Sequence, residues 1–168
     1  MSPYQSSGLV LAIQPSSHGF GWVLFEGKMV PADYGIASAK GNLNEACMAR
    51  FEEMLDEFQP SAIILEKFEG EGTRQSERVR ILAETMCGFA RNRDMDALVY
   101  SKGEVNTAVV GNTKATRHAV ACATADRLPM LQHRLPEARK IWTCEDERRC
   151  LFDAAALGIT HYILTHQC

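Results

Sequence analysis

The sequence has no long hydrophobic run. Its longest apolar stretches, such as Leu9 to Ile13 and Ala62 to Leu65, are far shorter than the roughly 20 residues that a transmembrane helix needs. The segment from Met1 to Ser7 also lacks the basic region and the apolar stretch of a signal peptide. We therefore expect a cytoplasmic protein that does not insert into a membrane.

Two common kinds of site motif are missing as well. The loop from Glu69 to Thr73 contains glycine, but no Gly-Lys-Ser/Thr follows it, so we expect no nucleotide cofactor held by a phosphate-binding loop. The cysteines form no Cys-x-x-Cys pair, which favours buried reduced thiols over a metal or disulfide framework. There are six of them: Cys47, Cys87, Cys122, Cys144, Cys150 and Cys168. The histidines, including His18 and His118, show no metal-ligand spacing.

An excess of positive charge is also absent. Eighteen Lys and Arg against 21 Asp and Glu give a net charge of −3, which excludes a protein that coats nucleic acid indiscriminately. The bases are nevertheless concentrated, with five against two acids in 72–93 and six against two in 113–140. Those that could line a DNA groove are Arg74, Arg78, Arg80, Lys114 and Arg117, with Arg127, Arg134, Arg139 and Lys140 further along. The alternative is an ordinary solvated surface, and the scarcity of aromatic residues nearby favours phosphate contact over base reading.

What remains is the pattern of a single α/β domain spanning residues 1–168. The continuous apolar runs Val10 to Ile13 and Ala62 to Leu65 are typical of strands buried on both faces. Gly19 to Phe25 and Met29 to Ser38, joined by a turn at 26–28, extend the first strand into three antiparallel strands, and Ala97 to Tyr100 is the fifth. The sequence thus predicts a five-stranded mixed sheet flanked by helices.

Four helices are expected between and after these strands. Apolar residues recur at three- and four-residue steps over Leu43 to Phe58 and over Ser76 to Arg91. Asn112-Thr113 can cap a third helix that runs to about Leu128. Thr143, with Asp146 three residues later, can form a capping box for a last helix that reaches about Thr165.

Three polar residues lie where a site is expected. Gln14 and Glu66 each follow a central apolar run, and the ends of adjacent parallel strands meet at one edge of a sheet. Asp153 lies in a helical segment that is apolar nearly all round, where an uncompensated carboxylate would be costly. Asp153 is therefore either a metal ligand, or a partner of one, or a hydrogen-bonded aspartate at the edge of solvent.

These segments together resemble the RuvC-type Holliday junction resolvases. The stretch from Val10 to Ser17, with Gly19 and Gly21 after it, resembles the family's opening strand, in which Asp-Pro-Gly-Ser stands where this chain has Gln14-Pro15-Ser16-Ser17. Phe58 to Glu66 is similar to the segment with the second carboxylate. Val105 to Gly111, with Lys114 after it, resembles the segment before the DNA-facing and dimer-forming helix, and Asp153 to His161 resembles the closing helix with the last acid.

The resemblance implies a ribonuclease-H-like fold, a homodimer, and binding of branched or distorted DNA. It further implies phosphodiester hydrolysis with two divalent cations, Mg²⁺ or Mn²⁺, held by carboxylates. On this basis Glu66 and Asp153 are catalytic metal ligands, and Gln14 occupies the degenerate position of the first aspartate. Glu147 and Glu69 are further candidate ligands, with solvated surface acids as the alternative.

The departures from the family pattern leave the activity open. Gln14 brings no negative charge, and losing one carboxylate at about 4 Å costs on the order of 4 kcal/mol per ion at an effective dielectric near 20. Ser16 replaces a glycine, and Cys150 stands one turn before Asp153, where the family often has another ligand. One hypothesis is a DNA-binding protein whose nuclease activity is lost or weakened; the other is an active structure-specific endonuclease with an altered ligand set. A glutamine introduced by engineering is a third explanation of Gln14.

Overall fold

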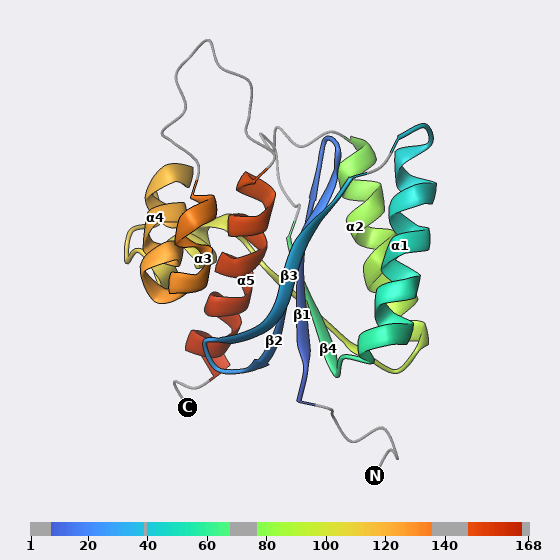
Figure 1. Ribbon diagram of the computed structural model, residues 1–168, viewed down its shortest axis with the longest axis horizontal. Coiled ribbons are helices and arrows are strands. Elements are labelled where there is room, and N and C mark those ends of the chain that lie inside the picture. Colours follow the sequence, from blue (N-terminus) through green and yellow to red (C-terminus); the bar gives the residue numbers. More distant parts are fainter. Residues whose placement is uncertain (1–7, 39, 68–76, 136–147, 166–168) are drawn as a thin grey trace.

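The computed structural model describes residues 8–38, 40–67, 77–135 and 148–165. In this part of the chain a five-stranded sheet separates two layers of helices (Figure 1). The strands are β1 (Val10–Ser16), β2 (Gly19–Gly27), β3 (Val30–Ser38), β4 (Ala62–Glu66) and β5 (Asp96–Tyr100). The helices are α1 (Leu43–Phe58), α2 (Glu77–Asn92), α3 (Lys102–Val109), α4 (Arg117–Arg127), the 3₁₀ helix η1 (Pro129–Arg134) and α5 (Arg149–Thr165).

The strand order is β3-β2-β1-β4-β5. β1, β2 and β3 are antiparallel neighbours, whereas β4 pairs in parallel with β1 on one side and with β5 on the other. The prediction of a mixed sheet with three antiparallel strands first is therefore confirmed. α1 and α2 provide the crossover connections that parallel pairing requires.

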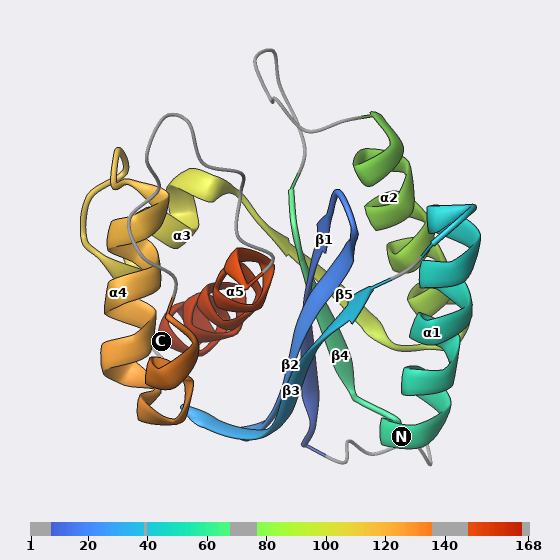
Figure 2. The ribbon, with the colours of Figure 1, turned by 45° about the horizontal axis from the view of Figure 1, so that its top comes forward.

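Side chains along the central strands alternate between the two faces of the sheet, so the hydrophobic core has two parts, one on each face. Leu11 and Ile13 of β1 face α1 and α2, whereas Val10 and Ala12 face α5 on the opposite side of the sheet. α5 lies directly against the sheet, and α3 and α4 pack on its outer side (Figure 2). α5 is therefore buried between the sheet and two helices, which explains why it is apolar nearly all round.

α3 was not expected from the sequence. Ser101, directly after β5, accepts a hydrogen bond from the Glu104 backbone N–H at 3.1 Å and so caps this short helix, which buries Val105 and Val109. Glycine at position 103 and only two buried hydrophobic side chains hid the helical pattern.

The predicted cap of the next helix was wrong. The Asn112 side chain accepts from the Lys114 backbone N–H at 3.0 Å and closes a local turn. α4 instead begins at Arg117, where the Thr116 hydroxyl accepts from the Ala119 N–H at 3.1 Å. The proposed capping box of Thr143 and Asp146 lies outside the described residues.

No helix in the described part of the chain is long and apolar enough to cross a membrane. The four cysteines in that part, Cys47, Cys87, Cys122 and Cys150, are free. Cys47, Cys87 and Cys150 are buried, as expected, whereas Cys122 is half-buried; Cys144 and Cys168 lie outside the described residues.

Candidate functional site

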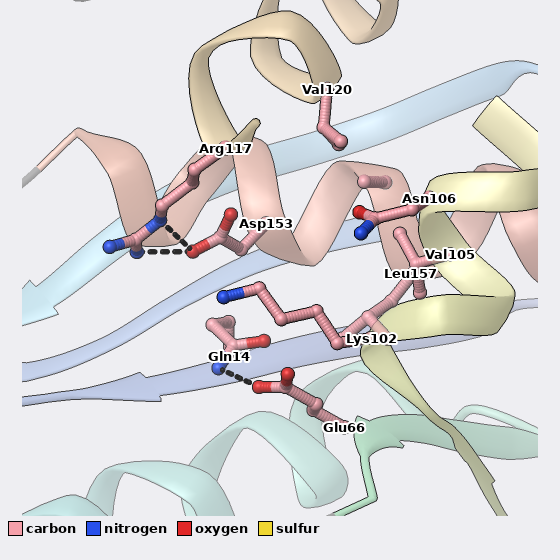
Figure 3. A pocket seen from close by; sticks show the side chains of 10 residues that line it. Gln14, Glu66, Lys102, Val105, Asn106, Arg117, Val120, Asp153 and Leu157 are labelled. Atoms are coloured by element: carbon pink, nitrogen blue, oxygen red, sulfur yellow. Dashed lines mark hydrogen bonds and ion pairs between the residues drawn. The ribbon is translucent and has the colours of Figure 1, made fainter. Parts of the chain in front are cut away.

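Gln14 and Glu66 meet at one edge of the sheet, as predicted. The two residues lie in phase with the β1 and β4 residues that face α5, and the Gln14 Nε2 donates a hydrogen bond to Glu66 Oε2 at 3.0 Å (Figure 3). Gln14 is 4% exposed, so this bond is held within the protein rather than at its surface. An amide donor thus occupies one lone pair of the carboxylate.

The environment of Glu66 favours its neutral form. Burial raises the pKa of this carboxyl above its ordinary value, and the negative charge of Asp153 raises it further. The hydrogen bond from Gln14 and the charges of Lys102 and Arg117 act in the opposite direction but do not cancel the effect of burial. Glu66 is therefore a carboxylate that is costly to ionise.

Asp153 forms an ion pair with Arg117. The guanidinium donates to Asp153 Oδ2 from Nε at 3.0 Å and also from an Nη, which ties α4 to α5 (Figure 3). The Arg117 side chain is 34% exposed and the Asp153 side chain 22%, so solvent screens the attraction between them only partly. Asp153 therefore has an arginine as its counter-charge in this structure, and its role as a metal ligand stays a prediction.

A glycine lets α5 approach the sheet at this point. Gly21 of β2 pairs with Gln14 across the sheet, and a Cβ on Gly21 would lie 2.4 Å from the carbonyl carbon of Cys150. Only a residue without a side chain fits there. Because Asp153 follows Cys150 by one helical turn, this contact brings its carboxylate to the same end of the sheet as Gln14.

Cys150 does not add a charged ligand. Its side chain is 2% exposed, and burial raises the pKa of the thiol to about 11, against a weaker opposing effect of a hydrogen bond with Ser16. The thiol is therefore neutral at physiological pH. Ser16 and Cys150 are the two positions, in addition to Gln14, at which this chain departs from the RuvC pattern. These two residues thus contact each other.

Gln14, Glu66, Arg117 and Asp153 line a pocket of about 70 Å³, which has room for several water molecules. Lys102 and Asn106 of α3 line it too, and the Lys102 side chain runs into the pocket with its ammonium end toward Gln14 and Asp153 (Figure 3). The complete lining is Gln14, Glu66, Lys102, Val105, Asn106, Arg117, Val120, Asp153, Ala156 and Leu157. The pocket therefore unites three predicted site residues and Arg117, and adds two polar residues that sequence analysis missed.

Strand pairing could have revealed Lys102. Tyr100, the last residue of β5, pairs with Glu66, so the residues just after β5 lie beside the end of β4. The rule that brought Gln14 and Glu66 together applies equally to this third parallel strand. Asn106 gave no such signal, because its position depends on α3; its side chain donates to the Thr113 carbonyl at 3.0 Å.

The remaining predicted DNA-binding residues that the structure describes, Arg78, Arg80 and Lys114, lie outside the pocket lining. Arg78 donates to Asn44 Oδ1 at 3.0 Å and to the Ser16 carbonyl at 2.9 Å, so its guanidinium links α2 to α1 and to the end of β1. Arg80 is an exposed residue 3.7 Å from Glu77, and Lys114 is exposed. Arg74, Glu69 and Glu147 lie outside the described residues.

The described side chains around the pocket do not by themselves fit a pair of divalent cations. Such a pair needs several carboxylate oxygens between and around the two ions. Here one carboxylate accepts from an amide, the other is bound by a guanidinium, and a lysine enters the same space. In the described part of the chain, no three Asp, Glu, His or Cys side chains come together as a metal-binding group.

Comparison with known proteins adds structural relatives. A scan against protein-family models and a search of curated proteins give no match. Among solved structures, Thermus thermophilus RuvC matches with 20% identity and a TM-score of 0.68 over 94% of this chain and 95% of that chain. The structure of T. thermophilus RuvC in complex with Holliday junction substrate gives the same identity and TM-score over 94% of each chain.

A third solved structure shares the architecture. The yeast mitochondrial Holliday junction resolvase Ydc2 matches with 15% identity and a TM-score of 0.59 over 99% of this chain and 84% of that chain. At these identities the likeness concerns the fold. The chain has the ribonuclease-H-like fold of RuvC, with the five-stranded mixed sheet that the sequence predicted.

Proposed function

We propose that this chain is a RuvC-like protein that binds branched DNA of the Holliday-junction type and has lost, or greatly weakened, nuclease activity. The likeness to RuvC in complex with Holliday junction substrate supports the DNA partner. The observation that supports a loss of cleavage is the hydrogen bond from the Gln14 amide to Glu66, because an amide stands where the RuvC pattern has its first aspartate.

The physical reason is charge. A pocket that holds two divalent cations needs negative ligands around both, and the described lining offers two carboxylates opposed by two basic side chains. Binding does not have this requirement, because phosphate contacts need only donors and positive charge. Loss of the metal ligands therefore removes cleavage while leaving DNA binding possible.

DNA binding is assigned to the basic residues that the sequence singled out, Arg74, Arg78, Arg80, Lys114 and Arg117. Two equivalent sites on a homodimer would suit a junction with two-fold symmetry. We include the dimer and a cytoplasmic location in the proposal.

A second candidate is an Mg²⁺- or Mn²⁺-dependent endonuclease with an altered ligand set. One observation favours it: Glu66 and Asp153, the two acids retained from the RuvC pattern, line the same pocket. The two candidates share the DNA substrate and differ in strand cleavage.

Both candidates require binding of branched DNA. This binding is tested by fluorescence anisotropy with a labelled four-way junction, competed by unlabelled junction or by linear duplex of the same sequence. We expect the junction to compete at least tenfold better than the duplex. Equal competition would contradict a branched-DNA function. Light scattering of the free protein measures its mass and tests the dimer.

A further inference from the structure

The pocket contains its own positive charges. Counted as fully ionised, Glu66 and Asp153 carry two negative charges and Lys102 and Arg117 two positive ones, so the described lining has no net negative charge. A site made of carboxylates alone would repel a DNA phosphate until cations were bound to it. A neutral pocket with cationic donors has no such barrier.

Lys102 is the donor best placed to receive an anion. It is the first residue of α3, it is exposed, and its ammonium is directed into the pocket (Figure 3). Two other basic side chains near this end of the sheet are held by protein groups: Arg117 binds Asp153, and Arg78 binds Asn44 and Ser16. In the described part of the chain, by contrast, the Lys102 ammonium forms no ion pair with a carboxylate.

Arg117 assists phosphate binding while it remains paired with Asp153. Its guanidinium neutralises the nearest carboxylate, so an incoming phosphate does not meet an unpaired negative charge. The Gln14 amide donates a hydrogen bond to Glu66 but adds no charge. Each acid of the pocket therefore already accepts a hydrogen bond from a protein donor.

We propose that Lys102, supported by the charge of Arg117, binds a backbone phosphate of DNA directly in this pocket, with no divalent cation between them. This inference rests on the proposed function and deepens it by naming the contact. Lys102 supplies the donor and the positive charge for the phosphate, while Arg117 offsets the negative charge of Asp153.

The test compares Lys102→Met with Lys28→Met in junction binding. Both substitutions remove one exposed ammonium, but Lys28 lies in the β2–β3 turn, at the opposite end of β1 from Gln14. Affinity for a labelled four-way junction is measured in EDTA and in Mg²⁺, over a series of salt concentrations. Circular dichroism melts confirm that each variant is folded.

We expect wild-type affinity in EDTA to match that in Mg²⁺ after correction for ionic strength. Lys102→Met should weaken binding about tenfold and lower the slope of log K against log salt by about 1, the value for one lost phosphate contact. Lys28→Met should change neither quantity. Junctions with a neutral methylphosphonate at single positions near the branch should include one that abolishes the difference between wild type and Lys102→Met.

Two results would overturn the inference and leave the proposed function standing: junction-selective binding that needs Mg²⁺, or junction-selective binding that Lys102→Met does not weaken. A wild-type protein that binds no junction would overturn both. A protein that binds duplex and junction equally, yet loses one salt-dependent contact in Lys102→Met, would contradict only the junction preference.

Discussion

The guanidinium of Arg117 on α4 and the carboxylate of Asp153 on α5 form a partly buried ion pair in the lining of the pocket. The pair both fixes α4 against α5 and cancels the charge of an acid that the RuvC pattern would use for metal. One contact therefore both holds α4 against α5 and leaves Asp153 paired rather than free.

This ion pair should contribute measurably to stability. In a double-mutant cycle with Arg117→Ala and Asp153→Ala, we expect a coupling free energy of about 1–3 kcal/mol, because two charge-assisted hydrogen bonds are shielded from water. The exposed pair Arg50 and Glu53 on α1 is the matched control, with an expected coupling of about 0.5 kcal/mol. Urea unfolding provides the free energies, and equal coupling in the two pairs would argue against a partly buried Arg117–Asp153 contact.

Removing the charge of Glu66 should stabilise the protein at neutral pH. Because burial raises the pKa of Glu66 above its ordinary value of 4.5, the folded state holds the proton more tightly than the unfolded chain. Ionisation therefore costs stability as the pH rises from about that value through the raised pKa of the folded state. We expect Glu66→Gln to melt at a higher temperature than wild type at pH 7, with the difference shrinking toward pH 4.

Glu57→Gln on the exposed side of α1 serves as the control for this pH series, since it removes one exposed acid that does not line the pocket of Glu66. If Glu66→Gln lowers the melting temperature at pH 7, the assignment of a costly buried charge is wrong.

The close approach of β2 and α5 should make Gly21 sensitive to substitution. A Cβ there would lie 2.5 Å from the Cys150 oxygen and 2.5 Å from the Leu151 nitrogen, and neither backbone atom can move without shifting the helix. Gly21→Ala should therefore cost about 1–3 kcal/mol or more in the free energy of unfolding. Gly88→Ala, inside α2 with nothing within 4 Å of the added Cβ, should instead gain about 0.5–1 kcal/mol.

Denaturant unfolding of both glycine variants checks this pair of predictions. A Gly21→Ala protein as stable as wild type would mean that α5 does not pack where the structure places it.

Cysteine reactivity should follow burial. The Cys150 thiol has a pKa of about 11 and is 2% exposed, so it should resist iodoacetamide at pH 8, whereas half-buried Cys122 should react sooner. Mass spectrometry of briefly treated protein measures both rates. Equally fast labelling of Cys150 would show that the N-terminal turn of α5 opens readily.

The sheet and the long helices could be predicted because their patterns are local. Continuous apolar runs marked β1 and β4, and three- to four-residue periodicity marked α1 and α2. α3 was missed because its eight residues bury little and contain a glycine. Short elements fixed by tertiary contacts leave few traces in sequence periodicity.

The site was predictable to the extent that strand ends define it. Gln14 and Glu66 were placed together by the rule for parallel strands, and Asp153 by its odd position in an apolar helix. The partner of Asp153 was not predictable, since Arg117 lies 36 residues away and reaches it only through the packing of α4 on α5. The neutral charge of the pocket follows from that packing and not from any motif.

The most direct test of the account is strand cleavage of a four-way junction by the unmodified protein in Mn²⁺, read on a denaturing gel with Glu66→Gln as control. Because the pocket offers two hydrogen-bonded carboxylates and two cations to any metal, we predict intact strands from both proteins, under conditions where the junction is bound. Paired nicks near the branch point with wild type, absent with Glu66→Gln, would contradict the account and establish an active endonuclease with an altered ligand set.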